Sequence, residues 1–172
     1  MVQKLADVSP YTRGGFTPLS RAAKCGNEAV VRMLLEQGNV NPSTADENGK
    51  TPLFIAPCEG HEGVVKMLLE RRNVNPDTAN GDGETPLFGA ACEGREGVVK
   101  TPLERNDVNP NTANPSGQTP LSMAARKGRK RVVKILLGRS DVNPNTADER
   151  GQRPLFIAAR KGRERIVRIL LE

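Results

Sequence analysis

The stretch TPLFIAPCEGHEGVVKMLLERRNVNP, residues 51–76, decides the fold because its parts recur along the chain at one fixed period. Its opening triplet, Thr51-Pro52-Leu53, has counterparts whose starts are 34 residues apart. They are Thr17-Pro18-Leu19, Thr85-Pro86-Leu87, Thr119-Pro120-Leu121 and the variant Arg153-Pro154-Leu155. Self-similarity at such a period indicates an array of stacked structural repeats.

The triplet predicts the start of a short helix. Thr51 can accept a hydrogen bond from a free first-turn N–H, and Pro52 suits the first helical position, where a missing N–H costs little. Gly60 is expected just past the end of this helix, in the left-handed conformation that glycine tolerates. The same glycine stands in the other copies, at Gly26, Gly94, Gly128 and Gly162.

A second helix and an extended turn are expected to complete each unit. Val64, Val65, Leu68 and Leu69 are spaced to form one apolar helix face. The following Asn73-Val74-Asn75-Pro76 is too rich in turn formers to continue a helix. A turn comes next, in which Asp or Asn stands three residues before Gly: Asp46–Gly49, Asn80–Gly83, Asn114–Gly117 and Asp148–Gly151.

The whole pattern, T-P-L-x-x-A-A-x-x-G, then V-V-x-x-L-L, then V-N-P, resembles the ankyrin repeat. The copies are one residue longer than the usual 33. Ser20, Phe54, Phe88, Ser122 and Phe156 stand where the family usually has His. The 34-residue V-N-P form is similar to that of fungal ankyrin arrays. The resemblance covers nearly the whole chain and implies an all-α solenoid of helix–loop–helix units joined by extended turns.

The 172 residues are expected to form a single ankyrin-repeat domain, with repeats beginning near residues 17, 51, 85, 119 and 153. Residues 1–16 look like a partial leading unit, in which Asp7-Val8-Ser9-Pro10 imitates the V-N-P segment and Val2–Leu5 forms a helix stub. Phe156 belongs to the repeat pattern and is expected to be buried.

Two prolines interrupt predicted helices. Pro57, at the sixth position of its helix, replaces an alanine of the other copies and should kink or shorten that helix. Pro102 replaces a core leucine inside a second helix, and should break it or make it restart with Thr101 as a cap. The interruptions are either functional hinges or signs of degenerate repeats that their neighbours hold in shape.

The basic residues are concentrated in the last third of the chain. Residues 119–172 contain 14 Lys and Arg against 5 Asp and Glu, whereas residues 1–118 contain 12 against 15. Arg126-Lys127, Arg129-Lys130-Arg131, Arg160-Lys161 and Arg163 form the clusters. Such a patch is the expected footprint of a protein that binds nucleic acid or another acidic surface. The absence of an aromatic stacking platform and of a groove-entering motif weighs against nucleic acid.

No catalytic, cofactor or metal constellation can be assembled from the sequence. His61 is the single histidine, so a catalytic triad or a zinc site has no second candidate. Cys25, Cys58 and Cys92 recur about once per repeat, farther apart than a disulfide allows, and are expected as free thiols. No run approaches the ~20 apolar residues of a membrane span. We predict a non-enzymatic intracellular protein, cytoplasmic or nuclear, without cofactor or metal.

The resemblance implies a protein partner, bound by the turn tips and by the inner face of each first helix. By position, the tip residues are Glu47, Asn48, Lys50, Asp82, Glu84, Glu149 and Arg150. The helix residues are Lys24, Glu59, Glu93, Arg126, Lys127, Arg160 and Lys161. This groove would be acidic in the middle and basic at one end, which could fix the direction of a charged peptide.

Two other functions stay open. One is binding of nucleic acid or an acidic surface through the basic C-terminal repeats, and the other is a spacer role within a longer array. The sequence stops at Glu172 directly after Ile169-Leu170-Leu171, without the polar capping repeat that solenoids normally have. A fragment is therefore expected, with a last helix that frays or self-associates.

Overall fold

The computed structural model describes residues 14–172, which form ten α-helices in five pairs and no strand. The first helices of the pairs are α1 (Pro18–Cys25), α3 (Pro52–Glu59), α5 (Pro86–Glu93), α7 (Pro120–Lys127) and α9 (Pro154–Arg160). The second helices are α2 (Glu28–Glu36), α4 (Glu62–Leu69), α6 (Glu96–Leu103), α8 (Lys130–Leu137) and α10 (Glu164–Leu171). The helix stub expected at Val2–Leu5 and the segment Asp7–Pro10 lie outside the described residues.

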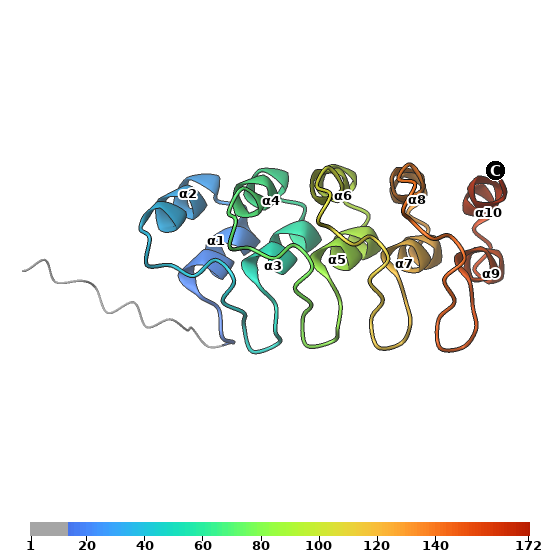
Figure 1. Ribbon diagram of the computed structural model, residues 1–172, viewed down its shortest axis with the longest axis horizontal. Helices are drawn as coiled ribbons and strands as arrows, with labels where there is room; N and C mark the ends of the chain where they lie inside the picture. Colours follow the sequence, from blue (N-terminus) through green and yellow to red (C-terminus); the bar gives the residue numbers. More distant parts are fainter. Residues whose placement is uncertain (1–13) are drawn as a thin grey trace, which may run out of the picture.

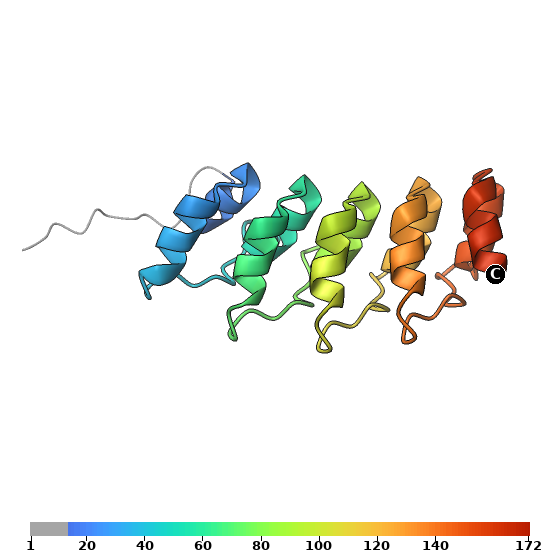
Figure 2. The same cartoon turned by 90° about the horizontal axis from the view of Figure 1, so that it is seen from above.

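The pairs stack side by side in chain order and make an elongated array (Figure 1). The first helices form one row, the second helices form a row beside it, and the turns between repeats project away from the second helices (Figure 1). Figure 2 shows the same succession from above. Helix α3 packs against both α1 and α5, and α4 packs against α6. The predicted all-α repeat solenoid is confirmed.

The first helices begin and end as the sequence predicts. The Thr51 side chain accepts a hydrogen bond from the Phe54 N–H at 3.2 Å, and Thr17, Thr85 and Thr119 cap their helices in the same way. Gly60 follows α3 with a φ of 92°, so only glycine suits this position without strain. Helix α9 differs, because Arg153 makes no side-chain cap and the helix already ends at Arg160, two residues before Gly162.

The core lies between the two helix rows. Helices α1, α3, α5 and α7 each bury a leucine, and every second helix buries at least one valine or isoleucine. Val64, Val65, Leu68 and Leu69 are all buried, as predicted for one apolar face. The prediction for Phe156 is wrong: it is 54% exposed, whereas Phe54 and Phe88 are 4% and 2% exposed. The difference arises because a following first helix covers Phe54 and Phe88 and none covers Phe156 in the described structure.

Pro57 does not shorten its helix. Helix α3 has eight residues, as do α5 and α7, so that part of the prediction is wrong. A proline at this position leaves the Leu53 carbonyl without its helical N–H donor. The helix ends only two residues later, however, and the Gly60 N–H bonds the carbonyls of Ala56 and Pro57 at 3.0 and 3.1 Å. The local cost is therefore confined to one hydrogen bond.

Pro102 does not break its helix either. Helix α6 runs without interruption and is as long as α4 and α8, so the predicted break or restart is wrong. Thr101 lies inside the helix, and its hydroxyl donates to the Gly97 carbonyl at 3.2 Å instead of capping a new helix. Helices α4 and α8 pack on either side of α6 and hold it in the register of the array.

Candidate functional site

Each turn between repeats is built around one Asp or Asn side chain, which is buried at Asp46, Asn80 and Asp148 and half-buried at Asn114. Asp46 Oδ1 accepts hydrogen bonds from the backbone N–H groups of Asn48 and Lys50, both at 2.9 Å. The Asp46 N–H in turn donates to the Lys50 carbonyl at 3.0 Å and closes the turn. Asn80, Asn114 and Asp148 make the corresponding bonds in the next three turns. The backbone at the tip of each turn is thus held in place by hydrogen bonds within the turn itself.

The predicted tip residues divide into two groups. Five of them are exposed: Glu47, Asn48, Asp82, Glu149 and Arg150. Lys50 and Glu84 are half-buried and are used within the fold. The Lys50 Nζ lies 5.8 Å from the centre of the Phe54 ring, and Glu84 Oε2 accepts from Asn80 Nδ2 at 3.3 Å.

Neighbouring turns are joined by backbone hydrogen bonds, with one exception. The Gly81 N–H donates to the Asn48 carbonyl at 2.8 Å, and the Glu149 N–H donates to the Ser116 carbonyl at 3.1 Å. Pro115 occupies the equivalent position in the turn between them, and a proline has no N–H to donate. Its ring packs against Gly83, where an added Cβ would come within 2.4 Å of it. We did not predict this difference, although Pro115 is the only proline at that repeat position.

The predicted residues of the first helices lie at the C-terminal ends of these helices and in the loops that follow. Lys24, Glu59, Glu93 and Lys127 are exposed, and so are Arg160 and Lys161. The Lys24 Nζ lies 5.3 Å from the centre of the Phe16 ring. Because α9 ends at Arg160, Lys161 belongs to the loop.

Arg126 is tied into the fold instead of being free. Its guanidinium lies 3.8 Å from the carboxylate of Asp148, which builds the next turn. In the amide orientation that satisfies both groups, the Gln118 side-chain oxygen accepts from both terminal nitrogens of Arg126 at 2.9 Å. Arg126 therefore links α7 to its own turn and to the following one. Glu149, Arg150 and Ser116 complete the wall of a hollow of about 150 Å³ at this point.

The loops between the two helices of the second, third and fourth repeats carry a second set of links, made by His61, Arg95 and Arg129. The His61 Nε2 lies 2.9 Å from the Lys24 carbonyl oxygen, and since a carbonyl can only accept, this nitrogen carries the proton. The Nε of Arg129 donates to the Cys92 carbonyl at 3.0 Å. These side chains bond carbonyls at the end of the first helix of the preceding repeat, where the positive charge of Arg129 is favourable. These links were not predicted, and their signal in the sequence is His or Arg directly after the recurring glycine.

Two cysteine thiols of the described residues are half-buried, at Cys58 and Cys92. Burial raises the pKa of the Cys58 thiol to about 12, with nearby Glu93 adding to the effect, and burial also raises the pKa of Cys92. Both thiols therefore stay protonated near neutral pH and are poor nucleophiles. Within residues 14–172, no three His, Cys, Asp or Glu side chains come together as metal ligands. No helix of this part of the chain is long and apolar enough to cross a membrane.

The comparisons with known proteins agree with this geometry. A family model described as ankyrin repeats in three copies matches residues 1–80, 39–112 and 87–172, which together span the chain. A search of curated proteins gives no match. Ankyrin repeats generally serve as protein–protein interaction modules. The chain therefore belongs to the ankyrin-repeat family, in agreement with its recurring helix pairs, its capped first helices and its turns built around Asp or Asn.

Proposed function

We propose that the chain is a non-enzymatic module that binds a protein partner on its inner face. We define the inner face as the surface made by the exposed turn-tip residues and the exposed residues at the ends of the first helices. The tip residues are Glu47, Asn48, Asp82, Glu149 and Arg150, and the helix-end residues are Lys24, Glu59, Glu93, Lys127, Arg160 and Lys161. The observation that carries the proposal is the construction of the tips. Glu47, Asp82 and Glu149 project from turns whose backbones are already fixed by Asp46, Asn80 and Asp148.

A fixed backbone lowers the cost of binding. Association normally orders loops and side chains, and that ordering is subtracted from the interaction energy. Here the turn backbone is ordered before any partner arrives, so only the exposed side chains lose freedom. The Gly81–Asn48 bond also sets the spacing of neighbouring tips. The inner face is therefore suited to a partner that contacts several tips at once.

Charge supports a directional contact. Glu59 and Glu93 are exposed on the middle repeats, whereas Lys127, Arg160 and Lys161 are exposed toward the last repeat. Complementary charge governs the association rate and the choice of partner more than the bare affinity. A peptide with a basic part and an acidic part would bind in one orientation along this face.

The test is a selection of binding peptides from a random displayed library, followed by affinity measurements. One variant carries Glu47→Lys, Asp82→Lys and Glu149→Lys at three tips. A matched variant carries Glu36→Lys, Glu70→Lys and Glu104→Lys, which make the same charge change at exposed positions at the ends of second helices. Selected peptides should bind the tip variant about tenfold or more weakly, a loss of about 1.4 kcal/mol or more.

The matched variant should bind the selected peptides with nearly the affinity of the wild-type chain. Peptides that bind the tip variant as tightly as the wild-type chain would contradict the inner-face proposal. Equal weakening in both variants would indicate a response to net charge instead of a contact with the tips.

A further inference from the structure

The starts of the second helices α8 and α10 carry a cluster of cations that the inner face does not include. We call it the basic edge and define it as Arg129, Lys130, Arg131, Arg163 and Arg165. Glu164 is the one carboxylate within these two segments. The edge lies at the loop that joins the two helices of each repeat, away from the turn tips.

The charges of the basic edge are mostly unpaired inside the protein. Arg131 lies 3.3 Å from Glu96, but the two side chains are 77% and 41% solvent-exposed, so the pair is worth little. The Nε of Arg129 donates to a backbone carbonyl, which leaves its charge uncompensated. The side chains of Lys130, Arg163 and Arg165 have no hydrogen-bond or ion-pair partner within residues 14–172.

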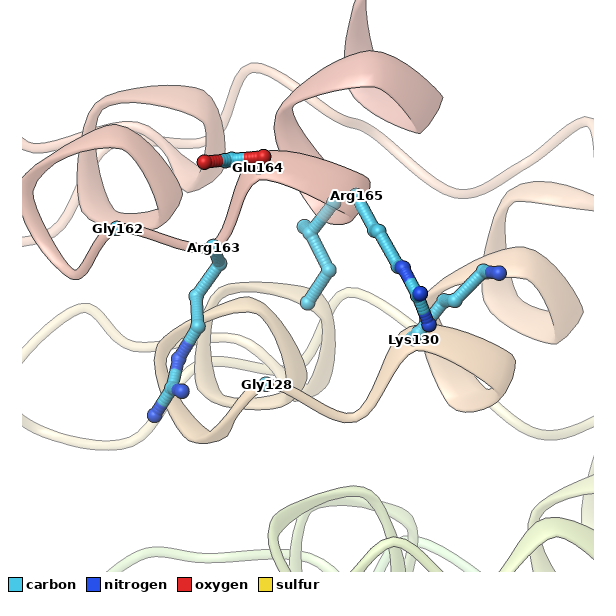
Figure 3. A pocket seen from close by; sticks show the side chains of 7 residues that line it. Gly128, Lys130, Gly162, Arg163, Glu164 and Arg165 are labelled. Carbon is cyan, nitrogen blue, oxygen red and sulfur yellow. The ribbon is translucent and has the colours of Figure 1, made fainter.

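A hollow of about 340 Å³ lies inside this cluster, between the starts of α8 and α10. Lys130, Arg163 and Arg165 line it, together with Glu164 and the apolar side chain of Ile166. In Figure 3, Arg165 extends from α10 toward Lys130 at the start of α8, and Arg163, directly before α10, extends beside Gly128 on the other side of the hollow. Gly128 and Gly162 add no side chains that could fill it. The cluster is therefore a concave basic surface and not only a row of solvated charges.

Stability of the helices alone does not account for these charges. The start of a helix favours negative charge, and α4, α6 and α10 each begin with a glutamate. Helix α8 begins with Lys130, which is also spaced to repel Lys134 one turn later. An anionic partner at the basic edge would offset both unfavourable effects.

We propose that the basic edge binds a short segment rich in Asp and Glu from a partner protein. Arginine pairs with carboxylates through two parallel hydrogen bonds, and all the cations that define the edge except Lys130 are arginines. Stacked helices lie about 8–10 Å apart, and an extended peptide rises about 3.3 Å per residue. Two repeats therefore match a segment of roughly four to six residues.

A short protein segment fits better than a nucleic-acid strand. On the same side of the array, the second helices of the preceding two repeats begin with Glu62 and Glu96. A long polyanion that followed the loops in that direction would meet these carboxylates. The basic edge also contains no aromatic side chain on which bases could stack.

The experiment is a fluorescence-anisotropy titration of the chain with a labelled peptide of alternating Asp and Glu, with an Asn/Gln peptide of equal length as the probe control. The test variant is Lys130→Glu with Arg165→Glu. The matched variant is Lys134→Glu with Arg168→Glu, which makes the same charge change on the same two helices one turn away. The acidic peptide should bind the test variant roughly tenfold more weakly and the matched variant within about twofold of wild type.

Three results would overturn the proposal. They are no binding of the acidic peptide at low salt, equal weakening by the two variants, and tighter binding of labelled random-sequence DNA or RNA that the test variant abolishes. The last result would make the edge a nucleic-acid site, with affinity falling steeply as salt rises. Circular dichroism checks that the variants keep their helices, and Lys130→Gln with Arg165→Gln replaces the test variant if they do not. The inner-face variants leave this edge intact, so the two proposals fail separately.

Discussion

Asp77 is a side chain whose hydrogen bonding is incomplete within an otherwise regular array. Its Oδ2 accepts the Asn109 N–H at 2.9 Å, but Oδ1 is buried without a hydrogen-bond partner in the described part of the chain. Burial raises the pKa of the Asp77 carboxyl, and the neighbouring Asp107 raises it further. Asn111, one repeat later, accepts from the Asn143 N–H at 2.7 Å and donates from Nδ2 to the Asp141 carbonyl at 2.6 Å.

Replacement of Asp77 by Asn should therefore stabilise the protein. The new amide could donate to the Asp107 carbonyl, and we expect about 1 kcal/mol more free energy of unfolding near neutral pH. A carboxyl whose pKa is raised by folding contributes stability at acid pH that is lost as pH rises through the folded-state pKa. The advantage of the variant should accordingly grow with pH in urea-denaturation curves.

Asp82→Asn provides the control for this prediction, because Asp82 is an exposed aspartate in the following turn. Asp82→Asn removes one negative charge, as Asp77→Asn does, but it introduces no amide at a buried position. If the two variants change the free energy of unfolding equally at every pH, the explanation based on the buried oxygen is wrong.

Among the helices, those with internal prolines show what the sequence could and could not predict. The caps at Thr51 and Gly60 depend on neighbouring residues, and both were predicted correctly. The effect of Pro102 depends on α4 and α8, which hold α6 from both sides and are distant in sequence. Phe156 was misjudged for a related reason, since its burial requires a following helix. For the candidate site, five of the seven tip residues named from position in the repeat are exposed, but position did not predict that Lys50 and Glu84 are half-buried or that Arg126 pairs with Asp148.

Helix α6 should gain stability when Pro102 is replaced by Leu, the residue at the equivalent Leu68 and Leu136. The change restores one backbone hydrogen bond and removes the ring clash, together worth about 3 kcal/mol. Chemical denaturation would measure the gain, and hydrogen exchange should show added protection through α6. Pro57→Ala, which matches Ala91 and Ala125, should stabilise less because it also removes buried ring surface. An unchanged midpoint for Pro102→Leu would show that α6 carries no strain from its proline.

The array as a whole leaves apolar side chains uncovered at its last repeat. Phe156 is 54% exposed, whereas the equivalent Phe54 and Phe88 of inner repeats are buried. Leu171 is 68% exposed. Exposed apolar surface of this kind promotes association between molecules. We propose that copies of the 172-residue chain, when it is studied on its own, associate weakly through the surface around Phe156 and Leu171.

Sedimentation velocity at increasing protein concentration tests the association. Phe156→Ser with Leu171→Lys should lower the association severalfold, because serine already fills the Phe156 position in two other repeats as Ser20 and Ser122. Met33→Lys serves as the control, since Met33 is 61% exposed at the opposite end of the array. Association that persists in the Phe156 and Leu171 variant would place the contact elsewhere.

Pro115 has a consequence for the shape of the array. The third and fourth repeats are bonded on the side of the second helices, where Arg139 donates to the Leu103 carbonyl at 2.7 Å and Arg131 pairs with Glu96. On the turn side, Pro115 cannot supply the N–H that joins other neighbouring turns. The array should therefore bend most easily at this junction, with its curvature changing as the turns on either side separate or close. A pair of spectroscopic labels on Asp82 and Ser116 would follow that bending, and Pro115→Glu, which restores a backbone donor, should reduce its range.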